Sequence, residues 1–199
     1  MNIDNGIVLK NYHINRKKLL LLDAQRGKIE VTYREHQSRI QQLVHGAHIN
    51  YKFEAHNARP SIAHINIMAM PCHLARTNIS FFHMILELCH HFIPINSNTE
   101  PIFELVHYLF TTPSTLSQSA QYLALCRFFA LVGMYPEELP IAEESFNELC
   151  YQSFNDTILT KKLDSSEHHM IQSWVLRCID VHPKKNTFKT FFTLAKNGI

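Results

Sequence analysis

The sequence predicts an α+β fold, in which a small N-terminal β-barrel is followed by an α-helical C-terminal domain. Two observations support this prediction. Strand-length runs separated by turn residues fill the chain up to residue 70, and apolar residues recur at helical spacing beyond it. With 199 residues, 46% of them hydrophobic and 18% charged, the chain is able to bury a sizeable core. We therefore expect a barrel domain over residues 1–70 and a helical domain over residues 71–199.

Five short segments of the barrel domain have the length of β-strands, and several alternate apolar with polar residues. Asp23-Ala-Gln-Arg-Gly27 reads as a hairpin connection in which the glycine supplies a positive φ. The expected strands are residues 6–9, 18–23, 27–33, 48–53 and 61–67. Five strands of this length predict an OB-like barrel, although strand count alone fits an SH3-like barrel as well.

Helical periodicity begins near residue 72, with proline and capping residues at several expected helix starts. Asp164-Ser-Ser-Glu167 resembles a capping box, and Gly133 followed by Pro136 marks the end of a strongly apolar helix. The expected helices are residues 72–93, 101–111, 115–133, 142–151, 165–181 and 186–196.

The charges are distributed unevenly along the chain. Residues 1–60 carry ten Lys or Arg and five Asp or Glu, residues 61–180 carry five and twelve, and residues 181–199 carry four lysines and no acid. A basic head, an acidic middle and a basic tail suggest two functional surfaces, while ordinary solvated faces remain an open alternative.

The five cysteines are odd in number and widely spaced, which favours free thiols in a reducing compartment over disulfides or a zinc ribbon. No apolar run reaches the length of a membrane span, and the N-terminus has no apolar signal core. We therefore expect a soluble, cytoplasmic protein with no membrane partner.

Several segments, in this order, resemble the RecO family of recombination mediators over roughly residues 5–140. The most recognisable is Arg127-Phe-Phe-Ala-Leu-Val-Gly-Met-Tyr-Pro136, which is similar to the family's Arg-Phe…Leu…Gly-Tyr-x-Pro segment. The other segments are Gly6-Ile-Val-Leu-Lys10, Leu19-Leu-Leu-Leu-Asp23 followed by Gly27-Lys-Ile, Ile79-Ser-Phe-Phe-His-Met-Ile-Leu-Glu-Leu88 and Pro101-Ile-Phe-Glu-Leu-Val-His-Tyr-Leu109.

The resemblance implies an N-terminal OB fold, a helical C-terminal domain and no enzymatic activity or cofactor. It implies that the protein binds and anneals single-stranded DNA, engages the C-terminal tail of single-stranded DNA-binding protein, and works with RecR to load RecA. The basic loop that family members carry after the third strand is shorter here. This keeps open the alternative of a divergent member that has lost DNA binding and acts as a protein-interaction adaptor.

The basic head supplies the candidate nucleic-acid contacts, because cations neutralise phosphates and interleaved aromatic rings stack on bases. The aromatic residues are Tyr12, Tyr33, Tyr51 and Phe53. The candidate cations are Lys10, Arg16, Lys17, Lys18, Arg26, Lys28, Arg34, Arg39 and Lys52. The lysines of the basic tail extend this track or form a frayed basic end.

The candidate partner site lies in the helical domain. An acidic tail that ends in an aromatic residue and a carboxylate needs an apolar pocket with a cation at its rim. Arg127 with Phe128 and Leu131 has this composition. The alternative is that Arg127 pairs with a neighbouring acid such as Glu104 or Glu87.

Metal-dependent and other enzymatic functions are disfavoured. Glu87-Leu-Cys-His90 and Glu104-Leu-Val-His107 have the Glu-x-x-His spacing of di-iron bundles, but segment 115–133 offers no acid to complete such a site. The chain also contains no phosphate-binding glycine motif, nucleophile elbow or His-Glu-x-x-His sequence. We therefore expect no metal site and no catalytic residues.

Overall fold

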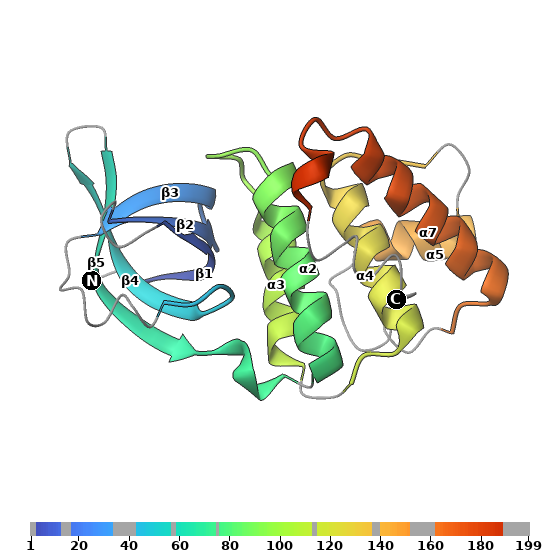
Figure 1. Ribbon diagram of the computed structural model, residues 1–199, viewed down its shortest axis with the longest axis horizontal. Coiled ribbons are helices and arrows are strands. Elements are labelled where there is room, and N and C mark those ends of the chain that lie inside the picture. The colour runs from blue at the N-terminus through green and yellow to red at the C-terminus, as the bar shows by residue number, and fades with distance from the viewer. Residues whose placement is uncertain are drawn as a thin grey trace. The chain divides into compact units, whose positions relative to one another are not determined.

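The computed structural model describes residues 3–12, 17–33, 43–56, 59–74, 76–112, 115–136, 140–151 and 162–188 (Figure 1). Its strands are β1 (Asp4–Asn11), β2 (Lys18–Asp23), β3 (Gly27–Tyr33), β4 (His48–His56) and β5 (Arg59–Ala69). Strands β2 and β3 have the bounds predicted from the sequence, β1 and β5 extend two residues further at each end, and β4 extends three residues further at its C-terminal end.

The strands form a closed barrel in the order β1-β2-β3-β5-β4, which confirms the predicted OB-like fold. Strand β1 pairs with both β2 and β4 in antiparallel fashion and so belongs to both halves of the barrel. The barrel closes where the end of β3 runs parallel to the start of β5, with Thr32 opposite Ser61 and Tyr33 opposite Ile62.

Alternate residues of the strands point inward and fill the barrel with aliphatic and aromatic side chains. The buried core consists of Val8, Leu19, Leu21, Ile29, Val31, Tyr33, Leu43, Ala47, Ile49, Tyr51, Ile62 and Ile65. Leu20 and Leu22 alternate with the inward residues of β2 and are buried as well. The outer face of β2 is therefore covered too, which explains its uninterrupted run of leucines.

The chain divides into two compact units, and the division differs from the boundary expected at residue 70. The first unit comprises Met1–Leu74 and Ile85–Phe103, and the second comprises Ala75–Met84 and Glu104–Ile199. Residues 85–103 belong to the barrel unit because the β2–β3 hairpin binds them. The Asn96 N–H, for example, donates to the Lys28 carbonyl oxygen at 2.7 Å.

The hairpin glycine fits against the same segment. Gly27 has a φ of +69°, as expected for its turn, and a Cβ built on it would lie 1.7 Å from the Ser97 carbonyl oxygen. Both the backbone conformation and the close approach of a second backbone therefore require glycine at this position.

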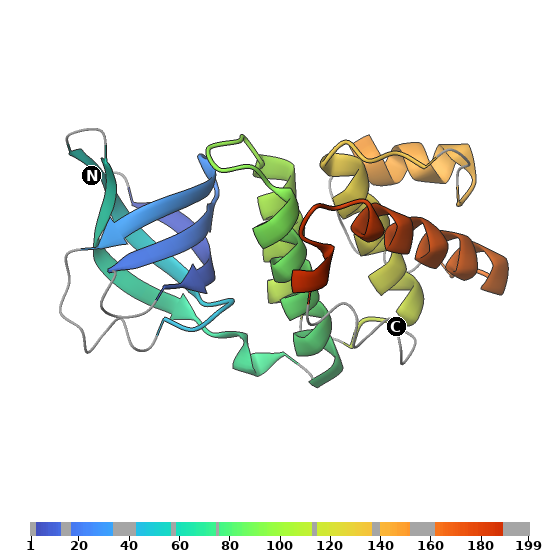
Figure 2. The ribbon, with the colours of Figure 1, turned by 45° about the horizontal axis from the view of Figure 1, so that its top comes forward.

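The described α-helices are α2 (Arg76–Phe92), α3 (Glu100–Thr111), α4 (Gln118–Leu131), α5 (Glu143–Tyr151) and α7 (Ser165–Asp180), and all lie at predicted positions (Figure 2). In the second unit α4 is buried on every side from Tyr122 to Ala130, as expected for a central helix. The Phe129 ring lies 6.1 Å from the Trp174 ring of α7, which in turn lies 6.2 Å from Phe146 of α5. These three aromatic rings form the core between α4, α5 and α7.

The predicted helix ends are largely confirmed. The Gly133 N–H donates to Ala130 O and the Met134 N–H to Phe129 O, which is a Schellman motif with Gly133 at φ +81°. Asp164 and Glu167 of α7 form the predicted capping box. For the helix expected at residues 186–196, a 3₁₀ helix, η3 (Lys185–Thr187), is present, and residues 189–196 lie outside the described residues.

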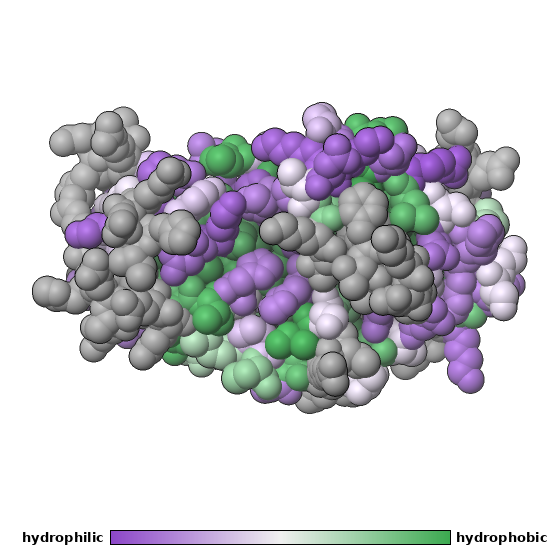
Figure 3. All heavy atoms as spheres, viewed as in Figure 1, coloured by the Kyte–Doolittle hydropathy of each residue, from purple (hydrophilic) through white to green (hydrophobic). Residues whose placement is uncertain are grey.

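Helix α7 is amphipathic, with hydrophilic side chains on its outer surface (Figure 3). Its buried residues are Ile171, Trp174, Val175, Cys178 and Ile179. Among the helices that the structure describes, none combines the length and the apolar character needed to cross a membrane.

We predict that Gly27→Ala destabilises the protein far more than Gly133→Ala. Both residues have positive φ, so each alanine costs about 1–2 kcal/mol in backbone strain. Only at Gly27 does the new Cβ meet another backbone, whereas nothing lies within 4 Å of a Cβ at Gly133. Urea unfolding followed by circular dichroism measures both variants, and an equal loss of stability in the two would contradict the observed fit.

Candidate nucleic-acid interface

Three lysines and a tyrosine lie where β1 ends and β2 begins, at one end of the barrel. Lys10 is exposed near the end of β1, and its Nζ lies 5.2 Å from the centroid of the Tyr12 ring. Lys17 is exposed, and Lys18 keeps 44% of its side chain exposed while pairing with Glu30 at 2.7 Å. We call Lys10, Tyr12, Lys17 and Lys18 the basic end.

Backbone hydrogen bonds hold the basic end together. The Tyr12 N–H donates to the Lys18 carbonyl oxygen, and the Tyr33 N–H donates to the Lys17 carbonyl oxygen, both at 3.1 Å. Lys17 has a φ of +45°, an uncommon value for a lysine, which turns the chain into β2. The cations are thus carried on a backbone that is fixed to β2 and to the end of β3.

The start of β5 lies beside the basic end. The Thr32 hydroxyl donates to the Pro60 carbonyl oxygen at 3.3 Å, next to the place where β3 and β5 pair. In OB folds the β1–β2 and β4–β5 connections border the face that binds oligonucleotides. The basic end, at the end of β1 and the start of β2, therefore corresponds in position to the border of that face. Arg16, Arg34 and Arg39, three of the predicted contacts, lie outside the described residues.

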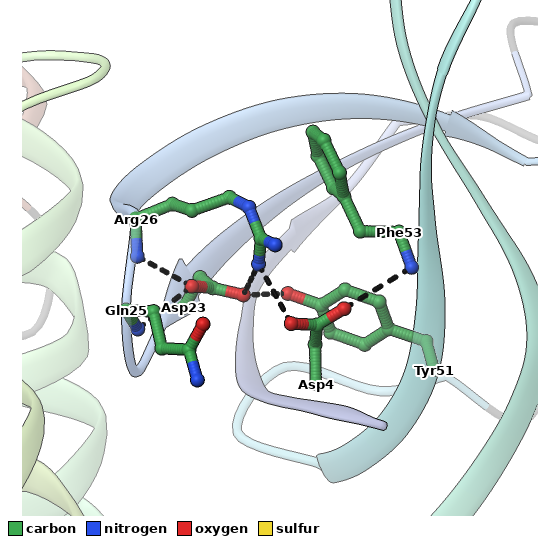
Figure 4. Close-up of polar contacts among 6 residues, drawn as sticks. All are labelled: Asp4, Asp23, Gln25, Arg26, Tyr51 and Phe53. Carbon is green, nitrogen blue, oxygen red and sulfur yellow. Dashed lines mark hydrogen bonds and ion pairs between the residues drawn. The ribbon is translucent and has the colours of Figure 1, made fainter. Parts of the chain in front are cut away.

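Arg26 lies at the opposite end of β2, where two carboxylates bind it (Figure 4). Its Nη1 is 2.9 Å from Asp4 Oδ1 and 3.4 Å from Asp23 Oδ2, and its guanidinium carbon is 4.2 Å from the centroid of the Phe53 ring. Burial opposes the charge, but the hydrogen bond to Asp4 and the two carboxylates raise the pKa of Arg26. The positive charge of Arg26 is therefore neutralised within the barrel.

The same two carboxylates also fix the backbone around them. Asp23 Oδ1 accepts the N–H groups of Gln25 at 2.8 Å and Arg26 at 2.5 Å, and Asp4 Oδ2 accepts that of Phe53 at 3.2 Å. The Tyr51 hydroxyl donates to Asp23 Oδ2, and burial together with the Asp23 charge raises the pKa of Tyr51. This network ties the hairpin, the start of β1 and β4 together.

Sequence analysis did not predict this network of Asp4, Asp23, Arg26 and Tyr51. Asp23 carried a local signal, because an aspartate that opens a tight turn often accepts its backbone N–H groups. Asp4 carried none, since 22 residues separate it from Arg26 and only the β1–β2 pairing brings them together.

Lys28 is buried, with 6% of the residue exposed, and it binds the end of α2. Its Nζ donates to the carbonyl oxygens of His90 at 2.5 Å and Ile93 at 2.7 Å. These carbonyls lie at a helix C-terminus, where the last oxygens have no partner within the helix and the helix dipole favours a cation. The structure thus places Lys28 in the interior of the barrel unit, away from solvent.

Five of the six described candidate cations therefore separate into two groups. Lys10, Lys17 and Lys18 lie together at the basic end, whereas Lys28, opposite Leu22, lies about 13 Å further along β2, and the hairpin that carries Arg26 begins about 17 Å along it, at about 3.3 Å per residue. Lys52 lies on β4 and pairs with Glu54 at 3.6 Å. The sequence could not reveal which of these cations are exposed and which are paired, because all of them carry the same positive charge and lie close together along the chain.

The predicted partner residues are mostly inside the second unit. Arg127 is 3% exposed, and its Nη1 donates to the Leu149 carbonyl oxygen near the end of α5. Phe128 is fully buried, and Leu131 is half-buried. Arg127 was expected at the rim of an apolar pocket. In the structure its guanidinium is buried and binds the end of a helix instead.

Within the described residues, no group of three or more His, Cys, Asp or Glu side chains is arranged to hold a metal ion. Burial raises the pKa of the Cys178 thiol to about 11 and also raises that of Cys89, which leaves these thiols protonated. Ser119 Oγ lies 3.1 Å from His168 Nε2 and accepts the Leu163 N–H, which links α4 to the start of α7.

We predict that Lys28→Met lowers the free energy of unfolding by roughly 2–4 kcal/mol, because two buried carbonyl oxygens lose their donor. The matched variant Lys17→Met removes the same charge at an exposed position and should change stability by less than about 0.5 kcal/mol. Thermal unfolding at fixed pH compares the two. A Lys28→Met variant as stable as Lys17→Met would contradict the structural role of Lys28.

In comparisons with known proteins, no protein-family model matches the chain, and no curated protein matches it.

Proposed function

We propose that this protein is a DNA-repair and recombination mediator of the RecO type, which binds and anneals single-stranded DNA on its barrel. The observation that carries the proposal is the basic end. Lys10, Lys17 and Lys18 present accessible charge beside Tyr12, at the end of an OB-like barrel where the end of β3 pairs with the start of β5.

The mechanism is electrostatic and involves no covalent step. Each lysine that contacts a phosphate releases a condensed counterion, and this release supplies most of the sequence-independent affinity. A strand whose phosphates are neutralised repels a complementary strand less, so that base pairing between two captured strands becomes faster. Such a protein has no need of a cofactor or of catalytic residues.

The helical part of the chain would provide the protein contacts of such a mediator. The proposed partners are the C-terminal tail of single-stranded DNA-binding protein and RecR, with RecA loading as the outcome, in the cytoplasm. Because the Arg127 guanidinium binds Leu149, tail docking at Arg127 would require it to leave the end of α5. Leu131 is the more accessible of the predicted contacts.

One observation favours the second candidate, an adaptor that has lost DNA binding. Four of the six described candidate cations already have acidic or carbonyl partners within the chain, namely Lys18, Arg26, Lys28 and Lys52. Only Lys10 and Lys17, of those that the structure describes, offer a charge without such a partner. A weak nucleic-acid interface would leave protein contacts as the main role.

We predict salt-dependent binding of single-stranded DNA that depends on the basic end. Fluorescence anisotropy of a labelled oligonucleotide, titrated at several salt concentrations, gives the affinity and its salt slope. The double variant Lys10→Glu with Lys17→Glu should weaken binding at least tenfold and reduce the slope by about 1.4, since each phosphate contact on a single strand contributes about 0.7.

The control for that measurement is Lys162→Glu with Arg177→Glu. These residues are exposed in the second unit, and their replacement changes the net charge by the same amount. If both double variants lose affinity equally, binding follows overall charge and the basic end is not the site. If the unmodified protein fails to bind at low salt, the mediator role is excluded and the adaptor role is favoured.

A further inference from the structure

We infer that Tyr12 is the residue on which a DNA base stacks, so that the basic end selects strands with unpaired bases over other polyanions. This inference rests on the function proposed above, and it adds that the protein recognises the unpaired bases of its ligand as well as the phosphates. It follows from the different environments of the four aromatic residues that accompany the candidate cations.

Three of the four rings are unavailable to a base or are already engaged. Tyr33 and Tyr51 are 3% and 1% exposed and belong to the barrel core. Phe53 is half-buried, packs against that core and has the Arg26 guanidinium over its ring. Tyr12 is half-buried and, unlike Phe53, does not belong to the barrel core or its packed rim; the ammonium group of the exposed Lys10 lies over its ring at 5.2 Å from the centroid.

The position of Tyr12 suits a stacking platform. Its backbone is fixed by the hydrogen bond to Lys18, and the ammonium group of Lys10 lies 5.2 Å from its ring centroid. A base that stacks on the ring would have the Lys10 ammonium near it to bind a phosphate, and the exposed Lys17 precedes the residue that holds the Tyr12 backbone. An ordered ring also loses little conformational freedom when a base binds.

The chemistry of the phenol is compatible with a polyanionic ligand. Burial and the nearby charge of Glu30 raise the pKa of Tyr12, and Lys18 only partly opposes this effect. The ring is thus neutral at physiological pH and does not repel phosphates. A tyrosine can meet a base with its ring face while its hydroxyl group contacts solvent.

Stacking gives a selectivity that lysines alone do not give. A lysine binds any phosphate, whether in a single strand, a duplex or another polyanion. A ring face gains energy only from an exposed base, and stacking is worth about 1–3 kcal/mol per base on alanine substitution, which corresponds to roughly 5- to 150-fold in affinity. Duplex DNA keeps its bases stacked and would not gain this contribution.

The test is a thermodynamic cycle with two proteins and two ligands. The full-length protein and its Tyr12→Leu variant are titrated against an oligothymidylate and against an oligomer of abasic sites with the same length and charge. We expect the unmodified protein to prefer the oligothymidylate at least tenfold, and Tyr12→Leu to lose most of that preference. The salt slope of Tyr12→Leu should equal that of the unmodified protein.

Two further variants separate stacking from damage to the fold. Tyr12→Phe keeps the ring and should retain the preference for bases. Tyr135→Leu removes a 61% exposed tyrosine from the second unit and should leave both affinities unchanged.

The outcomes distinguish the two proposals. Binding of both oligomers with equal affinity, or a Tyr12→Leu variant that keeps the full preference, overturns the stacking role and leaves electrostatic DNA binding in place. A loss in Tyr12→Phe as large as that in Tyr12→Leu also overturns it. Failure of the unmodified protein to bind either oligomer at low salt overturns the proposed function together with the role of Tyr12.

Discussion

The contact between Lys28 and the end of α2 is the interaction on which the barrel unit depends. A buried ammonium group costs several kcal/mol unless it is well solvated by the protein, and here two carbonyl oxygens at a helix C-terminus take the place of water. The same contact satisfies backbone oxygens that the helix itself leaves unpaired. The contact therefore accounts for the inclusion of residues 85–103 in the barrel unit.

A similar contact between a buried cation and a helix end occurs in the second unit, where the guanidinium of Arg127 binds a carbonyl oxygen near the end of α5. In both cases a cation that sequence analysis assigned to a ligand serves to join a helix end to its neighbour. Arg26 is used in a similar way, since Asp4 and Asp23 hold it at the hairpin. Among the candidate cations that the structure describes, Lys10, Lys17 and Lys18 at the basic end remain accessible to external ligands.

Local signals predicted much of the fold. Alternating apolar and polar residues predicted five strands. The first and last residues of β2 and β3 were predicted correctly, because four consecutive leucines mark β2 and a turn ending in Gly27 separates it from β3. Gly133 and Asp164 predicted the helix caps, since capping depends on only a few neighbouring residues. The boundary at residue 70 failed to anticipate that residues 85–103 join the barrel, because the contacts responsible span more than 60 residues.

The candidate site was harder to predict for the same reason. Lys17 and Lys28 look alike in the sequence, yet one is exposed and the other is bound to α2. Tyr12 and Tyr33 are both flanked by cations, but only the register of β1 to β3 decides which ring enters the core. Charge and composition pointed to residues 1–60 as a whole, while the placement of the individual side chains required tertiary contacts.

The central claim is that the exposed lysines of the basic end bind single strands while Lys28 serves the fold. Lysine acetylation with a succinimidyl ester, read by mass spectrometry with and without single-stranded DNA, tests it most directly. The account predicts that DNA protects Lys10, Lys17 and Lys18, that Lys162 and Lys184 react equally in both samples, and that Lys28 is unreactive in both. Rapid acetylation of Lys28 in the free protein, or protection confined to Lys162 and Lys184, would contradict it.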